Sequence, residues 1–272
     1  MGRVMASSGT VEILGVPVSV VDQATAIARV GGWIEERRQR RSKPRYVCAC
    51  DVNNVMSAQT NKIHMQALRR SDMVLPDGMP LVWVGRLRGE TRIGHVPGPD
   101  LLPAICQQST KTGWSHYFYG GAEGVADKLA ARMAASYPGL NVAGTHCPPF
   151  RQLAPDEMQR DLDRINASGA DVVWIGLGCP KQEIWMHEHH ARLQGRVLIG
   201  VGAAFDFHSG RVERAPLWMR QRGLEWLHRL ISEPRRLWRR YLVNAPKFVA
   251  LSLAETVALM GRRMVAQLWA KI

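Results

Sequence analysis

A glycine-rich turn after a buried strand presents three polar side chains that could take part in chemistry. Residues 171–175 form a short, almost wholly apolar run, typical of a strand buried on both faces of a parallel sheet. The turn that follows contains Gly176, Gly178 and Pro180. Ligands of open α/β sheets bind at the carboxyl ends of the strands, so we expect Lys181, Gln182 and Glu183 to face a crevice there. A tight strand-to-helix connection without a ligand is the alternative.

A carboxylate and two amides occupy the ends of two earlier predicted strands. One strand leads to Asn53 and Asn54, and the next leads to Asp77, which Gly78 follows. Asp77 lies on a rigid Pro-Asp-Gly turn at the expected ligand edge, which is a suitable position for a general base. In each case the alternative is a structural role, because Asn and Asp also cap the helices that follow strands.

Two glycines follow a further strand at residues 116–119. Gly120 and Gly121 precede a helix, and glycines in this position allow backbone N–H groups to approach a phosphate. The pattern is Gly-Gly-x-x-Gly and not the dinucleotide fingerprint, and no clear acidic ribose ligand follows about 20 residues later. The sequence therefore argues against an NAD-dependent oxidoreductase.

A histidine-rich run at residues 187–190 suggests metal binding at first. Its order is His-Glu-His-His, which lacks the His-Glu-x-x-His spacing that places two histidines one turn apart. We therefore expect a partly exposed helix face and no metal at this position.

The elements that must position these residues alternate between strand and helix along most of the chain. This alternation predicts a Rossmann-like, doubly wound, mainly parallel α/β sheet. A chain of 272 residues can form one large domain with an appendage. We predict an α/β core at residues 1–210 and an arginine-rich helical appendage at residues 211–272. The five cysteines show no disulfide or zinc spacing, which favours the cytoplasm.

The net charge of +13 calls for an anionic partner: a nucleic acid, an acidic membrane surface or a phosphorylated substrate. Residues 211–240 contain nine arginines and three glutamates, and so contribute +6 of this charge. The planar guanidinium suits a diphosphate or a lipid headgroup. A basic nucleic-acid-binding α/β protein is the alternative, but the arginines lack the aromatic strand motifs of such modules, so we do not expect nucleic acid.

A last helix is predicted after Pro246. Apolar residues recur along it at spacings of three and four, as at Val249, Leu253, Val257 and Met260. Such a side can lie in the interface of an anionic bilayer, pack against the core, or pack against a second subunit in a homo-oligomer. Charges interrupt the apolar runs well short of the roughly 20 residues of a spanning helix, so we expect peripheral membrane contact.

Several of these motifs occur in a fixed order over residues 11–243. They include Leu75-Pro76-Asp77-Gly78, the run Val96-Pro97-Gly98-Pro99-Asp100-Leu101, Pro180-Lys181-Gln182-Glu183, Gly202-Ala203-Ala204-Phe205-Asp206 and Glu233-Pro234-Arg235-Arg236. Together they resemble the WecG/TagA/CpsF glycosyltransferases, glycosyltransferase family 26.

The resemblance implies a metal-independent, inverting transfer from a UDP-sugar to a polyprenyl-pyrophosphate-linked saccharide. Such a reaction belongs to cell-surface polysaccharide synthesis and takes place at the cytoplasmic membrane face. The resemblance implies that Asp77 is the catalytic base. It also implies a set of substrate-binding residues, in which the arginines close over the diphosphate: Asn53, Gly78, His95, Gly120, Gly121, Gln182, Arg229, Arg236 and Arg239.

Two departures from the family pattern stand out. Relatives carry Thr-Pro-Asn where this chain has Asp51-Val52-Asn53, and they usually carry Arg where it has His95. A histidine is shorter than arginine and only partly charged near neutral pH, so we expect weaker diphosphate binding there or a different donor. The sequence does not identify the donated sugar.

Overall fold

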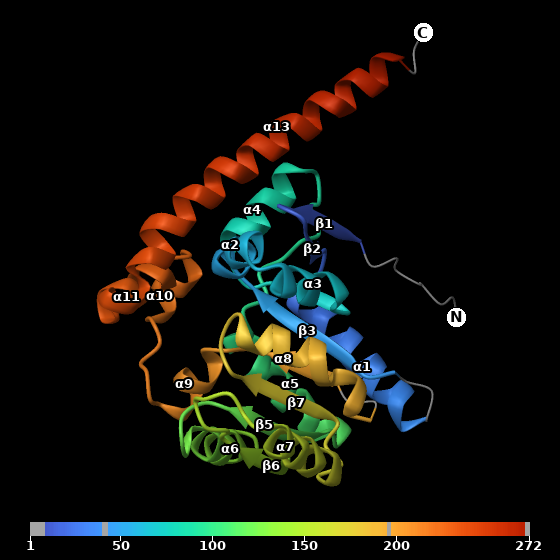
Figure 1. The fold of residues 1–272 in the computed structure, drawn as a ribbon, viewed down its shortest axis with the longest axis vertical. Coiled ribbons are helices and arrows are strands. Elements are labelled where there is room, and N and C mark those ends of the chain that lie inside the picture. The colour runs from blue at the N-terminus through green and yellow to red at the C-terminus, as the bar shows by residue number, and fades with distance from the viewer. Residues whose placement is uncertain (1–8, 40–42, 195–196, 270–272) are drawn as a thin grey trace.

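A six-stranded sheet forms the centre of the fold, and all of its strand pairs are parallel (Figure 1). The strand order is β4-β3-β8-β7-β5-β6. The strands are β3 (Arg45–Cys50), β4 (Met73–Pro76), β5 (Ser115–Gly120), β6 (Asn141–His146), β7 (Val172–Gly176) and β8 (Val197–Gly200). The prediction of a doubly wound, mainly parallel sheet is confirmed.

The computed structural model describes residues 9–39, 43–194 and 197–269, with side chains up to residue 262. The extreme ends of the predicted core and appendage therefore lie outside the described residues.

Helices cover both faces of the sheet. One face carries α2 (Val52–Thr60), α3 (Lys62–Arg70), α7 (Pro155–Ala167) and α8 (Lys181–His189), followed by a 3₁₀ turn at His190–Arg192. The other face carries α1 (Gln23–Arg38), α5 (Gly98–Thr112), α6 (Val125–Ser136) and α9 (Ala204–Ser209). In β7, Val173 and Ile175 belong to the first apolar cluster and Val172 and Trp174 to the second. Burial of both sets explains why this strand is apolar without alternation.

An antiparallel hairpin precedes the sheet. It consists of β1 (Thr10–Ile13) and β2 (Val16–Ser19), and its apolar residues join the first cluster together with Leu81 and Val82 of α4 (Met79–Leu87).

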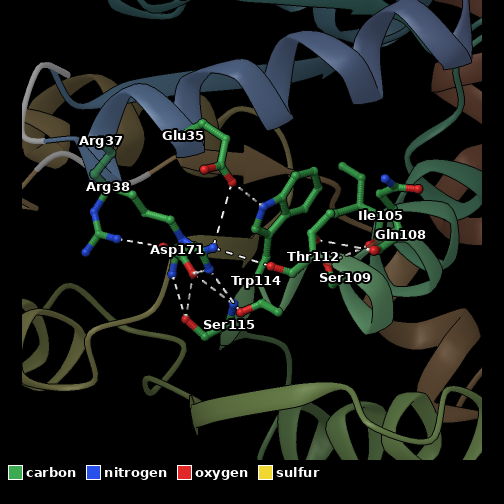
Figure 2. A network of polar contacts seen from close by, with 11 residues as sticks. Glu35, Arg37, Arg38, Ile105, Gln108, Ser109, Thr112, Trp114, Ser115 and Asp171 are labelled. Carbon is green, nitrogen blue, oxygen red and sulfur yellow. Dashed lines mark hydrogen bonds and ion pairs between the residues drawn. The ribbon is translucent and has the colours of Figure 1, made fainter.

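The amino-terminal edge of the sheet is held by a buried carboxylate (Figure 2). Asp171, directly before β7, lies 2.7 Å from Arg37 and 3.0 Å from Arg38 at the end of α1. It also accepts hydrogen bonds from the backbone amide and the hydroxyl group of Ser115 at the start of β5. Burial acts to raise the pKa of this carboxyl group, but the hydrogen bonds and charge of Arg38 and the hydrogen bonds of Ser115 outweigh it and hold the pKa below the usual value. This network fixes the edge that lies opposite the expected ligand edge.

Every element assigned after Gly210 is a helix. These are α10 (Leu217–Gln221), α11 (Glu225–Ser232), α12 (Pro234–Trp238), a π-helical segment (Arg239–Asn244) and α13 (Ala245–Trp269). In Figure 1, α13 is the long helix that crosses the end of the molecule beside α4 and β1. Among the described residues, every strand precedes this segment.

The side of α13 that faces the core is mainly polar, apart from Phe248, which is buried in the first apolar cluster. Arg88, just after α4, donates to the hydroxyl oxygen of Thr256 and the backbone oxygen of Ser252, and pairs with Glu255 at 2.7 Å. The exposed large apolar residues of α13 point away from the core: Val249, Leu251, Leu253, Val257, Leu259 and Met260. These exposed apolar residues therefore do not pack against the described core.

The continuous helical stretch Pro234–Arg262 has the length and composition of a membrane span, with a mean hydropathy of 1.3 in its most apolar window. Only 17% of that window is buried. This differs from the expectation that charges leave no helix long enough, because Lys247 and Glu255 are too sparse to interrupt the stretch. Core helices of soluble proteins can have the same length and composition, so these two properties alone do not define a membrane span.

Candidate active site

Asp77 lies directly after β4, at the carboxyl edge of the sheet. One carboxylate oxygen accepts a hydrogen bond of 2.9 Å from the backbone N–H of Gly98, the first residue of α5. Gly78, and not Asp77, occupies the N-cap position of α4, so the capping alternative for Asp77 on that helix is wrong. The other carboxylate oxygen of Asp77 can accept a hydrogen bond from a further partner.

The environment of Asp77 makes its carboxylate unusually basic. Burial raises its pKa to about 7, and the nearby charge of Asp51 acts in the same direction. The Gly98 amide and the guanidinium of Arg240 oppose this shift without cancelling it. A carboxylate with a pKa near neutrality is suited to accept a proton from a hydroxyl group at physiological pH.

An ion pair connects the appendage to this edge. Asp51 forms the N-cap of α2, with one carboxylate oxygen 3.0 Å from the backbone nitrogen of Asn54, and its other oxygen accepts from Arg240. The asparagines expected as caps therefore lie inside the first turn instead. The Arg240 side chain is 26% exposed, and its charge also acts on Asp77. The pair thus brings a cation from the appendage to the candidate base.

A hydrogen bond between Asn244 and Asn53 also joins the appendage to the carboxyl edge, beside the pair of Arg240 and Asp51. The side-chain amide of Asn244 donates to Asn53 at 3.3 Å, and Arg240 and Asn244 belong to the same π-helical segment. π-Helical turns often occur at functional sites. Asn53 also donates toward the Cys179 sulfur at 3.8 Å, so it lies between the appendage and the turn after β7.

Two further predicted residues contact the Asp77 turn. His95 donates from Nε2 to the backbone oxygen of Asp77 at 2.7 Å, and burial lowers the pKa of its imidazole. A Cβ atom on Gly78 would lie 3.3 Å from Cα of Asp51, so a glycine lets these two turns approach closely. Both residues hold the turn in place, whether or not they also contact a ligand.

The turn after β7 differs from the expectation that three consecutive side chains face a crevice. Gln182 and Glu183 are buried, and only Lys181 is exposed. One carboxylate oxygen of Glu183 accepts from the side-chain amides of Gln182, at 2.8 Å, and Asn54, at 2.9 Å. Burial raises the pKa of Glu183 to about 7. Glu183 thus fixes α8 against α2 beneath the site.

Within the described residues, His64, Cys179 and Glu183 have the spacing of a metal-binding group, with ligand atoms within 4.8 Å of one another. Nε2 of His64 lies 3.7 Å from the second carboxylate oxygen of Glu183. The histidine run at residues 187–190 is not part of this group.

The two glycines at the end of β5, Gly120 and Gly121, have clear packing roles. A Cβ atom on Gly120 would lie 2.6 Å from the carbonyl carbon of Gly176, and the amide of Gly121 donates to the Gly176 oxygen at 3.0 Å. The Gly121 amide is therefore already used within the fold. Gly121 and Gly176 also line a pocket of about 820 Å³.

The predicted arginines of the appendage lie in three different environments. Arg229 is partly buried, with its guanidinium 5.5 Å from the Phe207 ring centre. Arg236 is exposed and pairs with Glu233 at 2.7 Å, and the exposed Arg239 lies over the Trp238 ring. Arg240, which the sequence analysis does not single out, is the arginine that contacts Asp51.

The carboxyl edge thus combines a basic, partly buried carboxylate, a guanidinium and two amide side chains, which is the arrangement of an α/β enzyme that acts on an anionic ligand. Residues 11–262 match the Glycosyl transferase WecG/TagA/CpsF family, and the chain belongs to this family. The resemblance seen in the motifs is confirmed, and the protein is a glycosyltransferase.

Two relatives share most of their length with this chain. Over 212 residues it is 30% identical to the N-acetylglucosaminyldiphosphoundecaprenol N-acetyl-beta-D-mannosaminyltransferase of Bacillus spizizenii, which covers 78% of this chain and 80% of the relative. Over 199 residues it is 29% identical to the protein of the same name from Bacillus subtilis, which covers 73% and 75%.

Proposed function

We propose that the protein transfers a sugar from a UDP-sugar to a polyprenyl-pyrophosphate-linked saccharide, with inversion, during synthesis of a cell-surface polysaccharide. The names of the two relatives describe transfer of N-acetylmannosamine to a diphosphoundecaprenol-linked N-acetylglucosamine. The observation that carries the proposal is the basic carboxylate of Asp77 beside Arg240 at the carboxyl edge of the sheet.

In this mechanism Asp77 removes the proton from the acceptor hydroxyl group as its oxygen attacks the anomeric carbon of the donor. A single base is sufficient for inversion, because the attacking oxygen and the leaving group lie on opposite faces of the sugar. Gly98 donates to one oxygen of Asp77 and so fixes the direction of the carboxylate.

The leaving UDP gains negative charge as the glycosidic bond breaks, and Arg240 is placed to stabilise it. Its planar guanidinium matches diphosphate oxygens, and Asp51 holds it beside Asp77. Arg229, Arg236 and Arg239, together with Gln182 and Asn53, are proposed to complete the donor site when the substrate is bound. This proposal requires Arg236 and Arg239 to leave their present surface contacts.

The direct test is a transfer assay with a panel of UDP-sugars and a polyprenyl-pyrophosphate-linked N-acetylglucosamine. Since cationic side chains take the role of a metal here, we expect the rate to be the same in EDTA as in Mg²⁺. A loss of activity in EDTA that zinc or magnesium restores would contradict metal independence. Variants of His64 and Glu183 would then identify whether that group holds the ion.

The acid side of the pH profile should report Asp77. Because the base acts only when deprotonated and its pKa is raised to about 7, kcat/KM is expected to rise about tenfold per pH unit below pH 7 and to level off above it. An unperturbed aspartate would give a flat profile down to about pH 4. The raised pKa makes the folded state relatively more stable as the pH falls from 7 toward 4, so Asp77 itself does not cause acid unfolding in this window. A rate independent of pH from 5 to 9 would refute the assignment.

We further propose that residues 211–272 form an appendage that holds the 1–210 core on the cytoplasmic face of the membrane as a peripheral protein. The polar side of α13 is bonded to Arg88, which keeps the helix alongside the core, and its apolar side is exposed. Exposed apolar side chains beside a basic segment favour an anionic bilayer surface. The same exposed side would serve a homo-oligomer, which is the competing role.

The apolar side of α13 can be tested on vesicles that contain phosphatidylglycerol. The double variant Leu253→Asp/Val257→Asp is expected to bind them roughly 100-fold more weakly, because two exposed apolar side chains are lost from the interface. The matched double variant Leu253→Met/Val257→Leu should float with the vesicles like the wild type. Equal flotation of both variants, with a change in the sedimentation of the first alone, would favour the oligomer.

A further inference from the structure

Three side chains of metal-ligating types meet beneath the carboxyl edge, and the proposed mechanism uses none of them. His64 belongs to α3, Cys179 to the turn after β7, and Glu183 to the first turn of α8. One ligand atom of each lies within 4.8 Å of the other two. The imidazole comes from a part of the sequence far from the other two groups, so the tertiary fold creates this group of ligands.

Two of the three ligand atoms have no hydrogen bond. His64 and Glu183 are both fully buried, and among the described residues neither Nε2 of His64 nor Oε2 of Glu183 has a hydrogen-bond partner. The two atoms are 3.7 Å apart, which is too long for a hydrogen bond between them. Buried polar atoms without a partner are costly and rare. A bound species that both atoms contact would remove this cost.

The other polar atoms of these two side chains are already held by neighbours. Nδ1 of His64 lies 3.2 Å from the hydroxyl oxygen of Ser57. The second carboxylate oxygen of Glu183 accepts from the side-chain amides of Asn54, at 2.9 Å, and Gln182, at 2.8 Å. Metal ligands are oriented in this way by hydrogen bonds on the side that does not face the metal. The two unused atoms are therefore held in fixed directions.

The donor atoms of the group suit zinc. Imidazole nitrogen, thiolate sulfur and carboxylate oxygen are the usual ligands of Zn²⁺, and at zinc-ligand distances the atoms of a tetrahedral site lie roughly 3.3–3.6 Å apart. The spacing of His64 and Glu183 is close to this range. Burial lowers the pKa of His64 to about 4, so its imidazole is neutral, as a ligand must be. Magnesium prefers a set made only of oxygen ligands.

The sulfur completes the group on its more accessible side. Cys179 is only partly buried, which gives an ion a route to the two buried ligands. Burial raises the pKa of the thiol, so a thiolate there requires a cation beside it, and a bound zinc ion supplies this charge while the thiol proton passes to solvent. The amide of Asn53, which donates toward the sulfur at 3.8 Å, supports the same charged form.

We propose that His64, Cys179 and Glu183 bind one zinc ion, which joins α3 to the turn after β7 and to the start of α8. Solvent would occupy the fourth coordination position. The ion stabilises the floor of the carboxyl edge and takes no part in the transfer of the sugar, which the proposed function assigns to Asp77 and Arg240. The inference goes beyond that function and does not depend on it.

The first test is a titration of the metal-free full chain with Co²⁺, in a phosphine reductant that keeps the thiols reduced. Cobalt enters zinc sites, and a thiolate ligand gives it a charge-transfer absorption band. We expect one such band, complete at one ion per chain and abolished by Zn²⁺. Cys179→Ser should lose the band, and His64→Gln and Glu183→Gln should weaken cobalt binding roughly 100-fold. Cys147→Ser, which changes another partly buried cysteine, should behave like the wild type.

The melting temperature provides the second measurement. At a Zn²⁺ concentration about 100 times the dissociation constant, the wild type should melt roughly 5 °C higher than in a chelator, because the ion binds only the folded chain. Cys179→Ser should show no such rise. Its position is only partly buried, so this variant keeps the test valid where a change at the buried His64 or Glu183 prevents folding.

Three results would overturn the inference: no zinc binding by the wild type, cobalt binding without the thiolate band, or an equal effect of zinc on the melting temperature of Cys179→Ser. The first result would leave a buried water as the species that bridges His64 and Glu183. The proposed function is tested separately by the transfer rate. If zinc binds as expected and the rate also requires it, the inference stands and the metal independence of the proposed function fails.

Discussion

Replacing Asp77 by Asn is expected to lower kcat about 10²- to 10⁴-fold, the contribution typical of a positioned general base. The amide oxygen of Asn can still accept from the Gly98 amide, so the turn should keep its structure. What is lost is the ability to take a proton from the acceptor hydroxyl group. The rate of sugar transfer, measured at pH 8 with saturating donor and acceptor, gives the loss directly.

Two measurements separate this effect from damage to the fold. The Asp77→Asn variant should bind UDP as tightly as the wild type and should melt no lower. Indeed, a small gain in stability is expected at pH 8, because a partly buried carboxylate with a raised pKa is costly to ionise. Asp163→Asn, at an exposed position of α7, is the matched control and should transfer sugar normally. If Asp77→Asn transferred sugar as fast as the wild type, another group would have to act as the base.

The second large effect is expected at Arg240. Arg240→Ala should lower kcat about 10²- to 10³-fold, as for the removal of one group that stabilises developing negative charge. The loss should be larger near pH 6.5 than at pH 8, since Arg240 also lowers the pKa of Asp77. Its removal therefore moves the acid side of the kcat/KM profile to higher pH. Full pH profiles of the wild type and the variant check both statements.

Comparison with other arginines tests whether the position matters or only the charge. Arg235→Ala removes an exposed arginine from α12. With an acceptor solubilised in detergent, this variant should transfer sugar at nearly the wild-type rate. Arg240→Lys keeps the charge but loses the planar fork, so we expect an intermediate rate. Equal losses at Arg235 and Arg240 would mean that the appendage acts through its overall charge, and the specific role of Arg240 would be abandoned.

The sheet and the location of Asp77 were predictable because they depend on local signals. Short apolar runs that end in glycine or Pro-Asp-Gly mark buried parallel strands and their carboxyl ends. The pattern therefore indicates almost directly which residues lie at the carboxyl edge of the sheet. The family motifs add the role of the carboxylate, which position alone does not provide.

The partner of Asp51 was not predictable, because it comes from residue 240 and depends on helix phase. Arg239 and Arg240 are adjacent in an arginine-rich run, and only the course of the π-helical segment decides which one turns toward the core. Glu183 illustrates the same limit. A charged residue in the first turn of a helix that follows a strand is expected to be exposed, whereas hydrogen bonds from Asn54 and Gln182 allow Glu183 to be buried.

The buried Arg88 has a consequence for the choice of acceptor. It joins the end of α4 to Ser252, Glu255 and Thr256 and also donates to the backbone of β1. These contacts fix the position of α13 relative to the core. If α13 rests on the bilayer, the separation between the lipid headgroups and Asp77 is set by the protein and does not vary from one encounter to the next. A fixed distance of this kind would select acceptors by the length of their glycan. A carrier whose glycan is one sugar too short or too long presents its hydroxyl group at the wrong level, even if the terminal sugar is correct.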